Sequence, residues 1–179
     1  MPGLLRAVNH LINWKTHNLQ NACFYYAQMV EQARSLVFYE KLEVPDTLEG
    51  RFDCLSLHMA MVLIAVKREG NPRFSQELFD LFFADVDRNL REMGVGDLSV
   101  GRQVKKLAQN FYGVLQAYEE GISQEKLLFE SLIKNLYGGK SISQPVLKTL
   151  MIYMQASIEL LSQLSLTETQ VQIHWPELR

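Results

Sequence analysis

Four histidines, His10, His17, His58 and His174, are the side chains best suited to metal binding or to proton transfer near neutral pH. His10 and His17 are seven residues apart, whereas two ligands on one helix usually stand four apart, and that segment holds no carboxylate. His58 stands in a nearly continuous apolar helix, where a buried histidine with one hydrogen-bond partner is the commoner case. No nucleophile motif or phosphate-binding glycine loop occurs. We therefore expect no catalytic residue, no cofactor and no metal.

Acidic side chains crowd one predicted helix, where six acids stand against two bases over residues 77–97. A carboxylate-rich face can hold a metal or an acid and base pair. Here, however, Asp87 and Arg91 are four residues apart, and so are Arg88 and Glu92. This spacing, like the three residues between Asp85 and Arg88, favours ion pairs on a solvated helix face.

A basic segment follows at residues 98–113, which carry three cations and no acid. Arg102, Lys105 and Lys106 project from one helix face, opposite an apolar stripe. Such a face commonly serves solubility; the functional alternative is contact with RNA phosphate or with an acidic membrane or protein surface. The contrast between the acidic and the basic segment can also steer a charged partner.

Apolar periodicity predicts the helices that would position these side chains. Asp46 is the expected N-cap of the apolar helix at 48–69, and Asn71 with Pro72 starts the next helix. Because the 48–69 helix is apolar almost all round, it belongs in the middle of a bundle. The predicted helices are 4–17, 19–40, 48–69, one from Pro72 to before Gly94, one capped by Asp97 or Ser99 and closed by Gly121, 123–137, and one after Pro145.

The expected fold class is all-α: a single-domain helical bundle of about six to seven helices with an irregular C-terminal tail. Residues 1–40 would form N-terminal helices packed on or flanking the bundle, 41–166 the helical core, and 167–179 the tail. The length of 179 residues fits one domain. No alternating pattern is long enough to build a sheet.

Composition and charge limit which partners the protein is expected to bind and where it is expected to act. The net charge of −2 gives no general attraction to nucleic acid, so specific DNA binding is not expected. The two cysteines are far apart and outside metal-binding spacing. The longest apolar run, Met59 to Val66, is too short to span a bilayer, and the start of the chain lacks a secretory signal. We expect a protein that is not secreted and stays in the cytoplasm or peripheral at the inner membrane.

Two blocks of sequence form a specific combination. The first is VPDTLEGRFD at 44–53, and the second is LFFADVDRNLREMGVGD at 81–97, which runs on through Val100-Gly101, Lys105-Lys106 and Phe111-Tyr112-Gly113. In their motifs, order and separation these blocks resemble the ubiquinol-cytochrome c chaperone family, and the similarity covers roughly residues 30–165. The chain looks like the short bacterial members.

The resemblance implies an all-helical, non-enzymatic assembly factor of the cytochrome bc1 complex. Mitochondrial members work with a small partner protein, associate with the ribosome and handle newly made cytochrome b. The resemblance supplies no catalytic residue. On matching positions, and with Arg102 added from the basic face, the implied partner-binding residues are Asp85, Arg88, Arg91, Glu92, Asp97, Arg102, Lys105 and Lys106.

Three functions are compatible with these observations. The first is a chaperone that holds an apolar segment of cytochrome b, or of another bc1 subunit, and needs exposed apolar surface to do so. The second is an adaptor that binds the ribosome or a small partner chaperone through its charged faces. The third is an enzyme acting on a quinone or haem-like molecule in a bundle pocket around His58 or Tyr112. Peripheral membrane contact is compatible with each of them.

Overall fold

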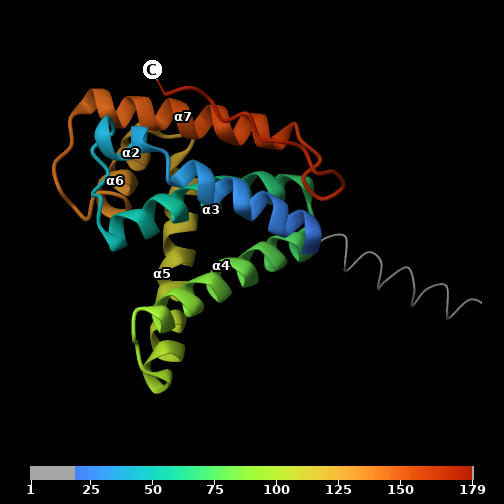
Figure 1. Cartoon of the computed structure of the whole chain (residues 1–179). Helices are drawn as coiled ribbons and strands as arrows, with labels where there is room; N and C mark the ends of the chain where they lie inside the picture. Colours follow the sequence, from blue (N-terminus) through green and yellow to red (C-terminus); the bar gives the residue numbers. More distant parts are fainter. Residues whose placement is uncertain (1–18, 179) are drawn as a thin grey trace, which may run out of the picture.

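The computed structural model describes residues 19–178, and over this range it contains helices and no strand, which confirms the all-α fold class. The predicted helix at 4–17 lies outside the described residues. The helices are a segment at 19–33, α2 (Leu36–Glu40), α3 (Leu48–Glu69), α4 (Pro72–Glu92), α5 (Asp97–Gly121), α6 (Glu125–Asn135) and α7 (Gln144–Ser162) (Figure 1).

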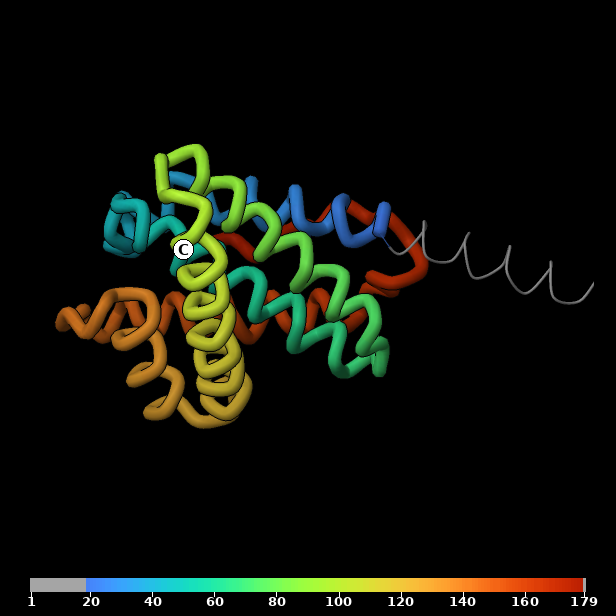
Figure 2. Tube along the Cα trace, turned by 90° about the horizontal axis from the view of Figure 1, so that it is seen from below, coloured from blue at the N-terminus to red at the C-terminus, as the bar shows by residue number. Residues whose placement is uncertain are grey.

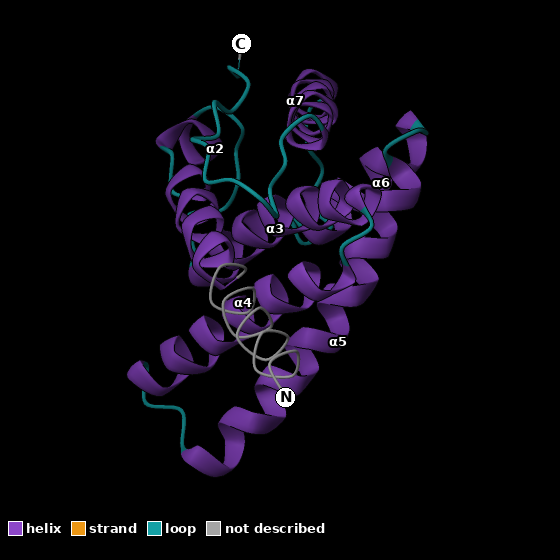
Figure 3. Ribbon diagram, turned by 90° about the vertical axis from the view of Figure 1, so that its right-hand side faces the viewer, coloured by secondary structure: helices purple, strands orange, loops and turns teal. Residues whose placement is uncertain are grey.

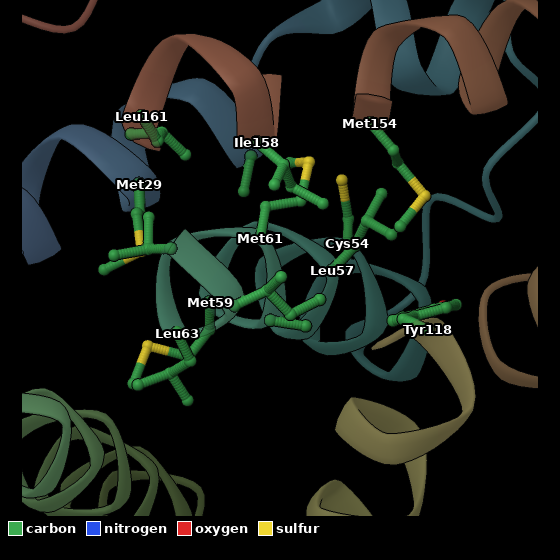
Figure 4. Packing of buried hydrophobic residues seen from close by; sticks show 14 of the residues in the cluster. Met29, Cys54, Leu57, Met59, Met61, Leu63, Tyr118, Met154, Ile158 and Leu161 are labelled. Atoms are coloured by element: carbon green, nitrogen blue, oxygen red, sulfur yellow. The ribbon is translucent and has the colours of Figure 1, made fainter. Parts of the chain in front are cut away.

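The apolar helix α3 lies in the middle of the bundle. It contacts α7 on one side and α4 and α5 on the other (Figure 3). Every residue from Ser56 to Val66 is buried, so α3 is enclosed all round, as its composition predicts. Met59 and Met61 of α3 and Met154 of α7 pack in this core (Figure 4), so these methionines fill the interior.

The predicted continuous helix at 19–40 is wrong, because the chain breaks between residue 33 and α2. The Tyr39 hydroxyl donates a hydrogen bond of 2.6 Å to the Ala33 carbonyl, and Ser35 is extended, with ψ of 129°. The break turns Phe38 into the core, where it is fully buried. Apolar spacing runs through such a break unchanged, since both segments bury one face.

The N-cap of α3 is also shifted from its predicted position. Thr47, not Asp46, has the extended N-cap conformation, and its hydroxyl accepts a hydrogen bond of 3.1 Å from the Gly50 amide. Asp46 instead accepts a hydrogen bond of 2.6 Å from the Arg51 guanidinium. Both residue types cap helices well, so adjacent candidates cannot be separated by residue type alone.

The predicted N-cap of α4 is confirmed, whereas the predicted N-cap of α5 is wrong. Asn71 caps α4 as predicted, because its side chain accepts a hydrogen bond of 3.1 Å from the Phe74 amide. At α5 neither Asp97 nor Ser99 is the N-cap; Gly96 takes that position. The Asp97 carboxylate pairs with Arg91 across the turn, which takes it away from its own helix end.

Glycine allows a close approach of α5 to α6. A Cβ atom on Gly121 would lie 2.9 Å from the Cα of Leu128. At the opposite end of α5, Gly94 has a φ of 85° and turns the chain between α4 and α5. The tip formed by these two helices projects from the remaining helices (Figures 1 and 3).

After α7, residues 165–178 form a segment without helix, here called the C-terminal strap, which begins with a turn at 165–169. The strap lies beside the helix at 19–33 (Figure 2). Asn21, Tyr25 and Gln28, on one face of that helix, make hydrogen bonds to strap backbone atoms between residues 167 and 173. The strap therefore joins the carboxyl end of the described chain to its first helix.

Replacement of Gln28 is expected to weaken the fold through the strap. The Gln28 side-chain oxygen accepts a hydrogen bond of 2.6 Å from the buried Ile173 amide. In a Gln28→Ala variant that amide loses its partner, so the free energy of unfolding should fall by about 1–3 kcal/mol. Urea denaturation measures the change. Gln20→Ala, an exposed position on the same helix, is the control, and equal losses in both variants would contradict the role of the strap.

Candidate binding groove

A groove of about 1160 Å³ opens mainly between α3, α4, α5 and α6 and is called here the central groove. α4 and α5 diverge from their shared tip (Figure 2), and the start of α3 and most of α6 form further walls. Its walls come from α3 between Leu48 and Ser56, α4 and its end between Asp85 and Met93, α5 between Leu107 and Ala117, and α6 between Leu127 and Asn135. The end of the helix at 19–33, between Val30 and Arg34, and Tyr39 of α2 complete the lining.

The lining of the central groove is largely apolar. Leu48, Met93 and Leu127 line it while keeping 57%, 49% and 39% of their surface exposed. Further half-buried apolar residues of the lining are Val30, Phe52, Leu55, Leu90, Leu107 and Val114. Exposed apolar side chains gathered in one concavity are typical of a surface that binds another apolar segment.

One polar stripe crosses the α3 wall. Glu49, Asp53 and Ser56 are four and three residues apart, so they share a helix face, and all three line the groove. Burial, reinforced by the negative charge of Glu49, raises the pKa of Asp53 to about 7. Asp53 is therefore partly protonated near neutral pH.

A basic face adjoins the groove on α5. Arg102, Lys105 and Lys106 are exposed, and none of them forms an ion pair within the described part of the chain. Gln109 and Asn110, three and four residues after Lys106, line the groove. The basic face thus continues along α5 into the groove wall, which brings charged and apolar binding surfaces together.

The predicted partner-binding residues of α4 lie in two places. Asp85 lines the groove, accepts a hydrogen bond of 2.9 Å from Tyr26 and pairs with Arg88, as predicted. The predicted pair of Arg88 with Glu92 is not formed; Glu92 is exposed. Because Arg88 reaches back toward Asp85, one predicted pair excludes the other.

The remaining predicted residues of the acidic segment stabilise the tip. Arg91 pairs with Asp87 of its own helix, as predicted, and also with Asp97 at the start of α5. The guanidinium therefore bridges α4 and α5 across the turn. This arrangement gives Arg91 and Asp97 a structural use at the tip, outside the groove lining.

His58 lies away from the central groove. Its Nδ1 is 2.8 Å from the Cys54 carbonyl oxygen and its Nε2 is 2.9 Å from the Tyr153 hydroxyl, so the buried histidine has two partners. The Trp175 ring of the strap packs against it, with ring centroids 5.3 Å apart. Burial lowers the pKa of His58 to about 4, which keeps the imidazole neutral.

The remaining candidate residues from the sequence are the other three histidines and Tyr112. His10 and His17 lie outside the described residues, and His174 is exposed. Tyr112 stacks on Phe79, with ring centroids 4.9 Å apart. Within residues 19–178 no group of three or more histidines, cysteines and acids could hold a metal ion. None of the helices in that range is both long and apolar enough to cross a membrane.

Sequence reasoning missed the groove residues of α3 and α6. Glu49, Asp53 and Ser56 do leave a signal, since they repeat with helical spacing at the start of an otherwise apolar helix. Leu127 leaves none, because an exposed leucine and a core leucine look alike in an apolar repeat.

Comparisons with known proteins agree on one family. The sequence profile described as ubiquinol-cytochrome C chaperone matches residues 40–173. The chain is 27% identical to ubiquinol-cytochrome-c reductase complex assembly factor 1 of Xenopus laevis, over 78% of this chain and 71% of that protein. The factor of the same name from Mus musculus is 25% identical, and the match spans about half of its length, 48%.

A solved structure has the same fold. The crystal structure of the Cbp3 homolog from Brucella abortus superposes with a TM-score of 0.76 and is 31% identical in sequence. The match covers 89% of this chain and 90% of that one. The similarity therefore extends over almost the whole of both chains.

Proposed function

The chain belongs to the ubiquinol-cytochrome C chaperone family, a family of non-enzymatic assembly chaperones, and we propose that it acts in assembly of the cytochrome bc1 complex. In this proposal it holds an apolar segment of newly made cytochrome b in the central groove. The segment is released when further bc1 subunits or haem take over. The proposed place of action is the inner-membrane surface, where such a client is inserted.

The observation that carries the proposal is the exposed apolar lining of the groove. A chaperone must offer apolar surface to a client that is not yet buried in its complex. Leu48, Met93 and Leu127 offer such surface in one concavity. The volume of about 1160 Å³ exceeds that of most small-molecule pockets and suits a polypeptide segment.

A second candidate function is supported by the basic face. Arg102, Lys105 and Lys106 are exposed and unpaired among the described residues, and α5 presents them beside the groove. An adaptor would use them, together with the exposed charges of α4, to bind the ribosome or a small partner protein. The two functions therefore differ in whether Arg102, Lys105 and Lys106 are needed to capture cytochrome b.

Charge reversal separates these two functions. With Arg102, Lys105 and Lys106 all changed to Glu, we expect capture of cytochrome b to stay within about twofold, because apolar contacts hold the client. The measurement is the amount of cytochrome b that co-purifies with the tagged full chain in mild detergent. A loss confined to this variant, together with capture by the native chain that falls as salt is raised, would instead favour the adaptor.

A matched control uses three other cations. Lys126, Lys140 and Lys148 are exposed and lie outside both the basic face and the groove lining. Their triple change to Glu produces the same change in net charge. If both triple variants lose cytochrome b equally, the cause is the general charge of the protein and not the basic face.

A further inference from the structure

The α3 wall of the central groove carries two parallel stripes of different chemistry. Both follow the same four-then-three spacing, so they run side by side along the helix. The apolar stripe is Leu48, Phe52 and Leu55, and the polar stripe is Glu49, Asp53 and Ser56. A ligand that lies along this wall meets hydrocarbon on one side and oxygen atoms on the other.

The polar groups of this wall lack partners. Ser56 is only 4% exposed, and its hydroxyl makes no hydrogen bond. The hydroxyl of Tyr118, which interacts electrostatically with Asp53, is fully buried and also makes none. Asp53 itself has no hydrogen bond or ion pair within residues 19–178. Buried polar groups in folded proteins are nearly always satisfied. Asp53 is half-buried and lines the groove, so its carboxylate is the member of this cluster that a partner from outside the chain can reach.

The cations of the groove do not satisfy Asp53. Arg51 also lines the groove, but its guanidinium is held by Asp46 at 2.6 Å. Arg34 and Lys134 line other walls and form no ion pair in the described chain. The charge that acts on Asp53 is the negative one of Glu49, which raises the pKa of the Asp53 carboxyl further. This wall therefore attracts a positive group.

We propose that the α3 wall is a subsite for a basic side chain, lysine or arginine, carried by the apolar segment that occupies the groove. The inference rests on the proposed function. The ammonium or guanidinium group donates hydrogen bonds to the Asp53 carboxylate. The hydrocarbon stem of the same side chain packs on Leu48, Phe52 and Leu55, as the stems of long basic side chains commonly do.

The subsite couples binding to the protonation of Asp53. A bound cation stabilises the carboxylate and lowers the pKa of Asp53 from its free value of about 7. Below that pH the cation must first displace a proton, so the preference for a basic side chain grows as pH rises from 6 to 8. The other titratable or charged groups that face Asp53 or line the groove with it are Glu49, Tyr39, Cys54, Tyr118, Arg34, Arg51, Asp85, Glu130 and Lys134.

Model peptides test the subsite on the full chain. The probes are fluorescent apolar helical peptides of about four turns, identical except for one central residue, which is lysine, norleucine or glutamate. Fluorescence anisotropy measures their dissociation constants at pH 8. We expect the lysine peptide to bind about tenfold more tightly than the norleucine peptide, and the glutamate peptide to bind most weakly.

Variants assign that preference to Asp53. In Asp53→Asn the lysine and norleucine peptides should bind equally, and the dependence on pH should disappear. Asp80→Asn is the control, because Asp80 is exposed on α4 outside the groove lining; this variant should keep the tenfold preference. Circular dichroism of both variants shows whether they are folded.

The outcomes separate the subsite from the proposed function. Equal binding of the lysine and norleucine peptides to the native chain overturns the subsite and leaves an apolar groove. A lysine preference that survives in Asp53→Asn overturns its assignment to the α3 wall. Absence of binding for every peptide overturns the groove function together with the subsite.

Discussion

A Gly113→Trp variant is expected to capture at least tenfold less cytochrome b than the native chain. Gly113 lines the central groove from α5, and a Cβ atom added there meets nothing within 4 Å. An indole at this position enters the groove without disturbing the bundle, so it occupies the space of the client. The measurement is cytochrome b recovered per tagged chain after affinity purification from the native host in mild detergent.

Gly101 supplies the matched control for that variant. It also lies on α5 with open space around an added Cβ atom, but it does not line the groove. Gly101→Trp should therefore keep the capture of cytochrome b. Undiminished capture by Gly113→Trp, or an equal loss in both variants, would show that the client does not occupy the groove.

A Gly50→Ala variant is expected to lose about 3 kcal/mol of unfolding free energy. An added Cβ atom would lie 2.0 Å from the Pro45 carbonyl oxygen, which is backbone and cannot rotate away. Either the linker before α3 or the first turn of α3 must shift. Both changes would move the α3 wall, so client capture should fall as well.

Urea denaturation measures this loss, and Gly113→Ala is the control. The alanine at position 113 has free space and a better helix propensity, so that variant should be more stable by about 0.5–1 kcal/mol. Gly50→Ala with native stability would mean that the contact between Pro45 and α3 is looser than the structure places it.

The parts of the fold that were predicted from sequence depend on local signals. Asn71 followed by Pro72 marks the start of α4 correctly, because both residues act on the first turn of their own helix. The nearly unbroken apolar run of α3 likewise predicts its central position. The break near Ala33 and the cap at Thr47 were missed, because each is decided by tertiary contacts or by a choice between adjacent residues.

The strap and the groove depend on contacts between distant segments. The strap is held through its backbone atoms, by Tyr25 and Gln28 among others, and backbone contacts leave no residue pattern. The groove combines side chains as far apart as Asp53 and Leu127. Among the charged residues predicted to bind a partner, Asp85 lines the groove and Lys106 lies beside it. No pattern in the sequence distinguishes the apolar residues of the groove walls from those of the core.

Site-specific photo-crosslinking in cells that assemble the bc1 complex tests the central claim most directly. A photoreactive amino acid is placed at Leu127 or Met93 in the groove, and at Ile152, which is 61% exposed on α7 outside the groove, as the control. We expect adducts with cytochrome b from both groove positions and none from Ile152. Adducts from Ile152 without any from Leu127 or Met93 would contradict a client held in the central groove.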